Sequence, residues 1–187
     1  YANEYALPRA VVINRLDRER ADFFRTLESL QKRLKGRLCP LQLPIGSEAG
    51  FKGVVDLVAM KALLADNGKV KEAEIPGEVT DDAKAWREKL MEAVAETDDD
   101  LLAKYLEEGS IGEEEMVKAL GKAIGQGSLV PVMAAAATKG IGVQPLMDLI
   151  VAEFPSPAEA APVEGADPRN KQAVACAPDP KAPLAAV

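Results

Sequence analysis

Apolar positions near both ends of the chain predict a buried strand followed by a helix. Residues 10–13, AVVI, are apolar and mostly β-branched, as expected for a strand that helices cover on both faces. Between residues 18 and 35, apolar side chains recur every three or four positions, which predicts a helix that Gly36 ends. The same order returns in residues 128–137, SLVPVMAAAA, and in a last helix that begins near Gly142. The two ends therefore predict parts of one sheet.

The middle of the chain follows a different pattern. Residues 38–75 contain several short β-rich runs, and Asn67-Gly68 is a strong signal for a two-residue hairpin, so we expect an antiparallel sheet. Residues 80–99 predict a helix with one apolar stripe, and further helices follow it. This segment of about ninety residues is interpreted as an insertion between the two strand–helix pairs.

The expected fold class is α/β, with an inserted α+β subdomain. Neither half of the outer sheet can bury itself alone, which favours this arrangement over two independent domains. Pro131, inside the second predicted strand, favours an edge position because proline donates no hydrogen bond. Residues 155–183 hold seven of the thirteen prolines, which is typical of a linker. The expected divisions are a strand and helix at 1–36, the insertion at 37–127, the last strand and helix at 128–157, and a linker with the start of another domain at 158–187.

The charge of the chain is unevenly distributed. The formal net charge is −7, yet residues 1–37 carry 9 basic and 5 acidic side chains, whereas residues 71–115 carry 5 basic and 16 acidic ones. Such an acidic middle repels phosphates, so we expect no direct DNA binding. A basic protein surface is its natural complement.

The composition also limits the kinds of site and location. Cys39 and Cys176 lie far apart and the sequence has no histidine, which argues against a zinc site or a disulfide framework. No run approaches the roughly 18 apolar residues of a membrane helix, and the first residues lack the pattern of a signal peptide. We therefore expect a cytoplasmic protein with no membrane contact. Because it begins at Tyr1, the chain is interpreted as a piece of a longer protein.

Polar residues follow the first predicted strand directly, as NRLD at 14–17. In open α/β sheets, ligands bind at the carboxyl ends of the strands. The carboxylate of Asp17 has only acceptors, and so it matches the two adjacent N–H donors of guanine, a pair that adenine lacks. Asn14 would hold the loop and reach the other edge of the purine, and Arg15 would cover its face. A structural interpretation stays open, in which Asp17 caps the following helix and Asn14 forms a turn.

These residues resemble the N-K-x-D guanine signature of translational GTPases, with Arg15 in place of lysine. The later stretch AAATKGIGVQPLMDLIVAEFPSP, residues 135–157, resembles the S-A-x-K, G-V-Q-x-L-L-D and L-P-S-P segments of elongation factor G. RADFF, LQLPIGSEAGFKGVVDLVAMKA and KYLEEG match as well, so the resemblance covers nearly all of residues 1–157. It implies a P-loop GTPase-type parallel sheet, GTP or GDP as the ligand, and an elongation factor G-like parent that acts in translocation on the ribosome as a monomer.

The resemblance also implies roles for the second loop. Ala136, Ala137 and Lys139 fall on S-A-x-K, and the backbone N–H of Ala137 would donate to the keto oxygen of guanine. Ala136 replaces the family's serine and so lacks a hydroxyl that braces the loop. With Arg15, this departure suggests a paralogue of elongation factor G.

Two motifs of the family are absent from these 187 residues: the phosphate loop G-x-x-x-x-G-K-[ST] and the segment D-x-P-G-H with its catalytic histidine. We therefore assign no catalytic residue and expect the isolated chain to be inactive. Mg²⁺ would be bound only through the missing N-terminal part. The full-length parent is expected to be a GTPase.

The predicted helix at 80–99 carries an acidic stripe opposite its apolar one. The resemblance places Glu92, Glu96 and Asp99 on the acidic positions that approach the C-terminal domain of the ribosomal stalk protein. The plain alternative is an ordinary solvated face. A second hypothesis for the whole chain is a non-catalytic module that docks on the stalk.

Overall fold

The computed structural model describes residues 2, 4, 7–66, 69–156, 163–167 and 171–176. Contacts divide the chain into two units, Tyr1–Phe154 and Pro155–Val187, and each is described by itself. No helix among the described residues is long and apolar enough to span a membrane.

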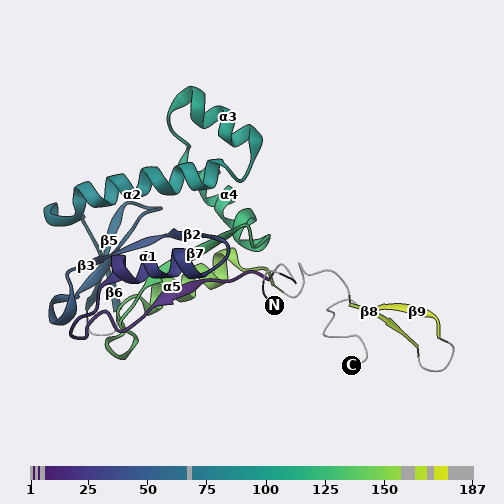
Figure 1. Cartoon of the computed structure of the whole chain (residues 1–187), viewed down its shortest axis with the longest axis horizontal. Coiled ribbons are helices and arrows are strands. Elements are labelled where there is room, and N and C mark those ends of the chain that lie inside the picture. The colour runs from purple at the N-terminus through teal and green to yellow at the C-terminus, as the bar shows by residue number, and fades with distance from the viewer. Residues whose placement is uncertain are drawn as a thin grey trace. The chain divides into compact units, whose positions relative to one another are not determined.

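A three-stranded parallel sheet in the first unit has the strand order β1-β7-β2 (Figure 1). Val11 pairs with Val132 on one side of β7, and Leu38 pairs with Val130 on the other. Since β1 and β7 are parallel neighbours, the loops that follow them lie at the same edge of the sheet. The elements at the two ends of this unit are β1 Val11–Ile13, α1 Phe23–Arg33, β2 Arg37–Pro40, β7 Leu129–Ala134 and α5 Val143–Glu153.

The expected edge position of Pro131 is wrong, because β7 is the central strand of this sheet. The carbonyl of Val132 accepts the Leu41 N–H at 3.1 Å, and the N–H of Ala135 donates to the Ile13 carbonyl at 3.0 Å. Backbone groups of a strand alternate between its two neighbours, so Pro131 faces the side of β1. The pairing with β1 begins only at Val132, and therefore the missing N–H of Pro131 costs no bond in that ladder.

Helix α1 begins later than the apolar periodicity indicates. The side chain of Asp22 accepts the backbone N–H of Arg25 at 2.9 Å and so caps the helix, whose first residue is Phe23. Arg20, inside the range expected to be helical, has a φ of 62° and cannot belong to a right-handed helix. The helix buries Phe23 and Leu27 in the core.

A four-stranded antiparallel sheet follows, with the order β3-β4-β5-β6. The antiparallel prediction for residues 38–75 is wrong at its start, since β2 pairs in parallel with β7. The reason is that β2 returns from helix α1 and so runs in the direction of β1. Asp66 pairs with Lys69 across a two-residue connection; the predicted turn at Asn67-Gly68 itself lies outside the described residues. The strands are β3 Gln42–Ile45, β4 Gly53–Asp56, β5 Lys61–Asp66 and β6 Lys69–Ala73, with a short 3₁₀ helix η1 at Glu48–Gly50.

Three helices complete the insertion: α2 Gly77–Ala95, α3 Asp99–Glu108 and α4 Glu113–Gly125. The single helix expected at 80–99 is therefore wrong at its end. Thr97 donates its N–H to the Val94 carbonyl at 3.0 Å in a closing turn, and Asp98 then caps α3 by accepting the N–H of Leu101. A side chain that caps a new helix stops the old one from continuing.

One hydrophobic core serves both sheets and the helices of the insertion. Leu129 and Val132 of β7, Val55 of β4, Leu90 of α2 and Ile124 of α4 are all fully buried in the same cluster. The predicted α/β fold with an inserted antiparallel sheet and helices is confirmed.

The second unit contains a hairpin in the range that we expected to include a linker. Strands β8 Val163–Ala166 and β9 Ala173–Cys176 pair in antiparallel fashion. Proline content alone did not predict these strands.

Candidate functional site

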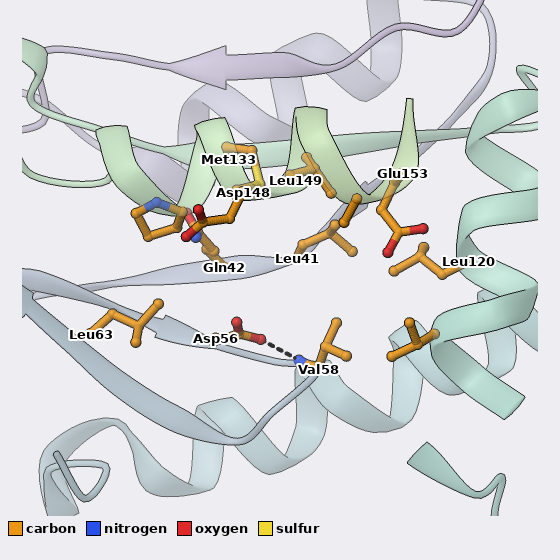
Figure 2. Close-up of a pocket in the computed structure, with 13 residues that line it drawn as sticks. Leu41, Gln42, Asp56, Val58, Leu63, Leu120, Met133, Asp148, Leu149 and Glu153 are labelled. Atoms are coloured by element: carbon orange, nitrogen blue, oxygen red, sulfur yellow. Dashed lines mark hydrogen bonds between the residues drawn. The ribbon is translucent and has the colours of Figure 1, made fainter. Parts of the chain in front are cut away.

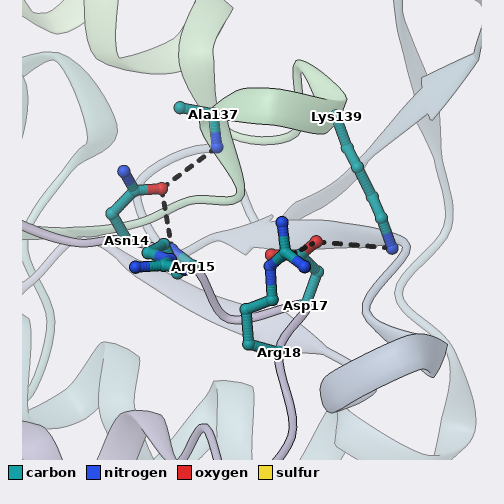
Figure 3. Close-up of polar contacts among 6 residues, drawn as sticks. All are labelled: Asn14, Arg15, Asp17, Arg18, Ala137 and Lys139. Atoms are coloured by element: carbon teal, nitrogen blue, oxygen red, sulfur yellow. Dashed lines mark hydrogen bonds and ion pairs between the residues drawn. The ribbon is translucent and has the colours of Figure 1, made fainter.

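Two loops meet at the carboxyl edge of the parallel sheet, one after β1 and one after β7. The N–H of Ala135 donates to the Ile13 carbonyl at 3.0 Å, and the N–H of Leu16 donates to the Ala135 carbonyl at 3.2 Å. These bonds continue the pairing of β1 and β7 into the loops. Figure 3 shows Asn14 beside the backbone N–H of Ala137, and Asp17 between Arg18 and Lys139.

Asn14 ties the two loops together. Its side-chain oxygen accepts the N–H of Arg15 at 2.7 Å and the N–H of Ala137 at 3.0 Å (Figure 3). The Ala137 N–H, which we expected to face a guanine keto oxygen, thus has a protein partner here. A base at this position would share that N–H with Asn14 or take it over.

The backbone turns sharply at Arg15. Its φ of 64° lies in the left-handed region, which residues with side chains adopt infrequently. The turn leaves the Arg15 side chain exposed, buries Leu16 beneath the loop, and brings Asp17 back toward the sheet edge. Arg15 is therefore exposed at the surface of the loop, whereas Asp17 lies largely buried at the sheet edge.

The Asp17 side chain is only 5% exposed, and one of its oxygens is unsatisfied. Its Oδ2 lies 3.6 Å from Lys139 Nζ and 3.8 Å from Arg18 Nε, whereas its Oδ1 is buried without any hydrogen-bond partner. Buried polar atoms are nearly always hydrogen-bonded, and leaving one unpaired costs about 1–3 kcal/mol or more for a charged group. This oxygen therefore indicates a ligand that brings its own N–H donors. Asp17 does not cap α1, since Asp22 does.

The second loop is held by backbone bonds. Ala136 is buried and exchanges hydrogen bonds with Ile141 at 3.0 and 3.3 Å, and its carbonyl also accepts the N–H of Lys139 at 2.9 Å. The 3₁₀ helix η2, Ala137–Lys139, lies inside this bridge. Ala136 thus acts through its backbone, which an alanine supplies as well as a serine.

Glycines shape the end of the same loop. Gly142 has a φ of 74°, and a Cβ there would come within 2.1 Å of the Ala134 carbonyl oxygen. Sequence reasoning missed this role of Gly142 and the contacts of Arg18 and Ile141. The short spacing of Gly140 and Gly142 was the available signal, since paired glycines mark turns with positive φ.

The three acidic residues expected on one helix lie on a helix, a turn and the next helix. Glu92 lies on α2, Glu96 follows its last residue, and Asp99 is the first residue of α3. All three are exposed. Glu96 forms an ion pair with Arg37 of β2, so it is not a free acid. The single helical stripe is thus wrong, because α2 ends before Asp99.

Comparisons with known proteins identify the family to which the chain is similar. The model of the elongation factor Tu GTP binding domain family matches residues 1–156. A crystal structure of a protein from Thermus thermophilus is similar with a TM-score of 0.76 and 36% sequence identity. The match covers 93% of this chain and 27% of that one, so this chain spans about a quarter of the length of that structure.

The expected membership in the translational GTPases is confirmed at the level of the family, whereas elongation factor G in particular stays a prediction. The match extends from β1 through the insertion to α5, and it includes both loops at the sheet edge. The chain belongs to the family of elongation factor Tu-type GTP-binding domains.

Proposed function

We propose that this chain supplies the base-binding half of the nucleotide site of a translational GTPase. The observation that carries the proposal is the buried, unpaired Oδ1 of Asp17. Guanine offers two adjacent N–H donors on its Watson–Crick edge, and a carboxylate accepts both. Binding would thus satisfy an oxygen that the protein leaves without a partner.

The neighbouring groups fit a guanine base. The amide of Asn14 meets the second edge of the purine, and Arg15 and the stem of Lys139 cover its faces. The N–H of Ala137, which donates to Asn14 Oδ1 in this structure, would donate in the complex to the keto oxygen of guanine, where adenine carries a donor of its own. ATP would then leave polar groups unpaired on both sides, which is a strong basis for rejection.

The phosphates and Mg²⁺ are assigned to residues outside this chain. The 187 residues contain no phosphate-loop motif and no histidine, so we expect weak binding of GDP or GTP and no GTP turnover by the chain alone. Measurable hydrolysis by the purified chain would contradict this division of the site.

The test uses the full-length parent and nucleotide competition. Fluorescent GDP bound to the parent should be displaced by GDP and not by ATP, and Asp17→Ala should weaken GDP binding by about tenfold or more. Glu19→Ala is the matched control, since Glu19 is an exposed carboxylate in the same loop. Equal GDP affinity in wild type and Asp17→Ala would remove Asp17 from the site.

The parent is proposed to be an elongation factor G-like translocation factor that acts on the ribosome in the cytoplasm as a monomer. The motif at 135–157 supports this choice within the family. The chain then comprises GTPase-domain parts at 1–36 and 128–157, the inserted subdomain at 37–127, whose first strand β2 also completes the parallel sheet, and a linker leading to another domain at 158–187.

A second candidate is a non-catalytic module that docks on the ribosomal stalk. The exposed acids Glu92 and Asp99 and the excess of 16 acidic over 5 basic residues at 71–115 favour a basic partner. Both functions can belong to one parent. The sequence upstream of this chain discriminates between them, because an intact phosphate loop supports the GTPase and a degenerate one supports the module alone.

A further inference from the structure

A pocket separate from the guanine loops lies between the antiparallel sheet, α4 and α5 (Figure 2). Its volume is about 230 Å³, and no residue of 14–17 or 136–139 lines it. The volume is below the roughly 300–1,000 Å³ of pockets for drug-sized ligands. Any ligand is therefore small.

Most of the pocket wall is apolar. The aliphatic side chains come from four elements and the segments that join them, and they include Leu41, Val58, Leu63, Leu120 and Leu149. This wall suits a short hydrocarbon chain.

One polar group in the wall has no partner. Gln42 is only 2% exposed, lines the pocket, and has a buried Oε1 without a hydrogen bond. Figure 2 shows Gln42 and Asp148 on one side of the pocket and Glu153 on the other, with Leu41 and Leu149 between them. A buried amide oxygen without a donor is costly, and it indicates a ligand that donates an N–H or O–H.

The other polar groups that line the pocket are the carboxylates of Asp56, Asp148 and Glu153. Asp56 Oδ1 already accepts the N–H of Val58 at 2.7 Å, and Asp148 Oδ1 accepts from Gln144 Nε2 at 2.8 Å. No lysine or arginine is among the lining residues, which leaves the pocket negative and rich in acceptors.

The fold makes room for Glu153. A Cβ at Gly121 of α4 would come within 2.2 Å of Glu153 Oε2, so the carboxylate in its present position lies directly against this helix. Burial raises the pKa of Glu153, and a nearby cation would offset that cost. Within the described part of the chain, no group of acids is arranged to hold a metal ion. The complement is an organic cation.

We propose that this pocket binds an aliphatic ammonium or guanidinium group, which donates an N–H to Gln42 Oε1, is attracted by the negative charges of Asp148 and Glu153 in the same wall, and lays its hydrocarbon part against the leucine wall. Two kinds of ligand carry such a group: a free alkylamine, and a lysine side chain of another protein. This inference does not depend on the proposed guanine site.

The experiment is an NMR titration of the 187-residue chain labelled with ¹⁵N. n-Pentylamine should shift the backbone signals of Gln42, Leu149 and Glu153 in a saturable way, and n-pentanol, which has the same chain without charge, should bind at least tenfold more weakly. Glu153→Gln and Gln42→Leu should each weaken n-pentylamine binding at least threefold. Glu107→Gln, a change at an exposed acid on α3, should leave it unchanged.

A peptide with a single central lysine separates the two sources of the cation. Tighter binding of the peptide than of n-pentylamine identifies a protein side chain as the ligand, and binding of n-pentylamine alone identifies a free amine. Equal binding of n-pentanol and n-pentylamine, or saturable shifts from neither compound, would overturn the proposal. Unchanged n-pentylamine binding in a folded Glu153→Gln variant would do so as well.

Discussion

The side-chain oxygen of Asn14 accepts the backbone N–H of Ala137 at 3.0 Å, although 123 residues separate the two in sequence. This bond joins the loop after β1 to the loop after β7. The insertion and its helices lie between them in sequence but not in space. Together with the bond from Leu16 to Ala135 and the ion pair of Asp17 with Lys139, this amide holds the two halves of the proposed base site in register.

Removal of this bond should loosen the site. Asn14→Ala is expected to lower the free energy of unfolding by about 0.5–1.5 kcal/mol, because Ala137 and Arg15 each lose an acceptor that water replaces only in part. Asn14→Asp keeps an acceptor and is the control. Denaturant unfolding of the three proteins measures the difference, and equal midpoints for wild type and Asn14→Ala would show that the bond does not stabilise the fold.

Two glycines in one loop should differ in their tolerance of a side chain. Gly140 and Gly142 have φ values of 71° and 74°, yet a Cβ at Gly140 meets nothing within 4 Å, whereas one at Gly142 would come within 2.1 Å of the Ala134 carbonyl oxygen. Gly140→Ala should cost only the left-handed strain of about 1–2 kcal/mol. Gly142→Ala should cost about 2–5 kcal/mol, since overpacking adds to that strain. Thermal unfolding of both variants checks the order, and equal costs would contradict the predicted clash.

The sequence predicted the elements that a local pattern determines. The strand at 10–13 and the helix near Gly142 have clear apolar signals, and the structure contains β1 and α5 there. Pro131 is tolerated in the central strand because its missing N–H faces β1 before the pairing with β1 begins. No local sequence pattern predicts which strands pair with β7 or where that pairing starts. The end of α2 depended on a cap by Asp98, and the sequence did not single Asp98 out from the neighbouring Asp99 and Asp100.

The candidate site was predictable in its residues but not in its contacts. NRLD and its position after a strand were visible in the sequence. The unpaired oxygen of Asp17 and the bond from Ala137 to Asn14 depend on the side-by-side placement of β1 and β7. That placement links residues more than a hundred positions apart, and a single sequence does not determine it.

The acidic residues at the junction of α2 and α3 should carry a contact that depends on salt. Glu92, Glu96 and Asp99 reversed together to lysine should slow stimulation of GTP turnover by the stalk protein, because several exposed charges act mainly on the association rate. The effect should shrink as salt is added. Glu96→Lys also breaks the ion pair with Arg37. The circular dichroism spectrum of the variant must therefore match that of the wild type, which shows that the fold is intact.

A matched control separates position from net charge in that experiment. Glu107, Glu108 and Glu114 are exposed acids on α3 and α4, and their reversal changes the net charge by the same amount. Docking at Glu92, Glu96 and Asp99 would be contradicted if the variant reversed at these three residues were stimulated at the wild-type rate in low salt. It would also be contradicted if the control variant lost as much stimulation of GTP turnover.

Cys39 should be inert to thiol reagents while the protein is folded. Burial raises the pKa of its thiol to about 12 from an ordinary value of 9.0, so at pH 8 the thiolate fraction is roughly a thousandfold lower than for an exposed cysteine. The variant Cys176→Ser leaves Cys39 as the remaining cysteine of two. Its labelling at pH 8 should be slow until denaturant is added, and labelling at the rate of free glutathione would show that Cys39 is accessible and ionised.

The identity of the base that pairs with Asp17 tests the account most directly. In the full-length parent, Asp17→Asn replaces an acceptor with an amide that also donates, which suits the extra carbonyl of xanthine in place of the amino group of guanine. We expect GDP affinity to fall and XDP affinity to rise, each by about tenfold or more, as measured by competition with fluorescent nucleotide. Glu19→Gln should leave both affinities unchanged. An undiminished preference for GDP over XDP in Asp17→Asn would contradict the assignment of Asp17 to guanine.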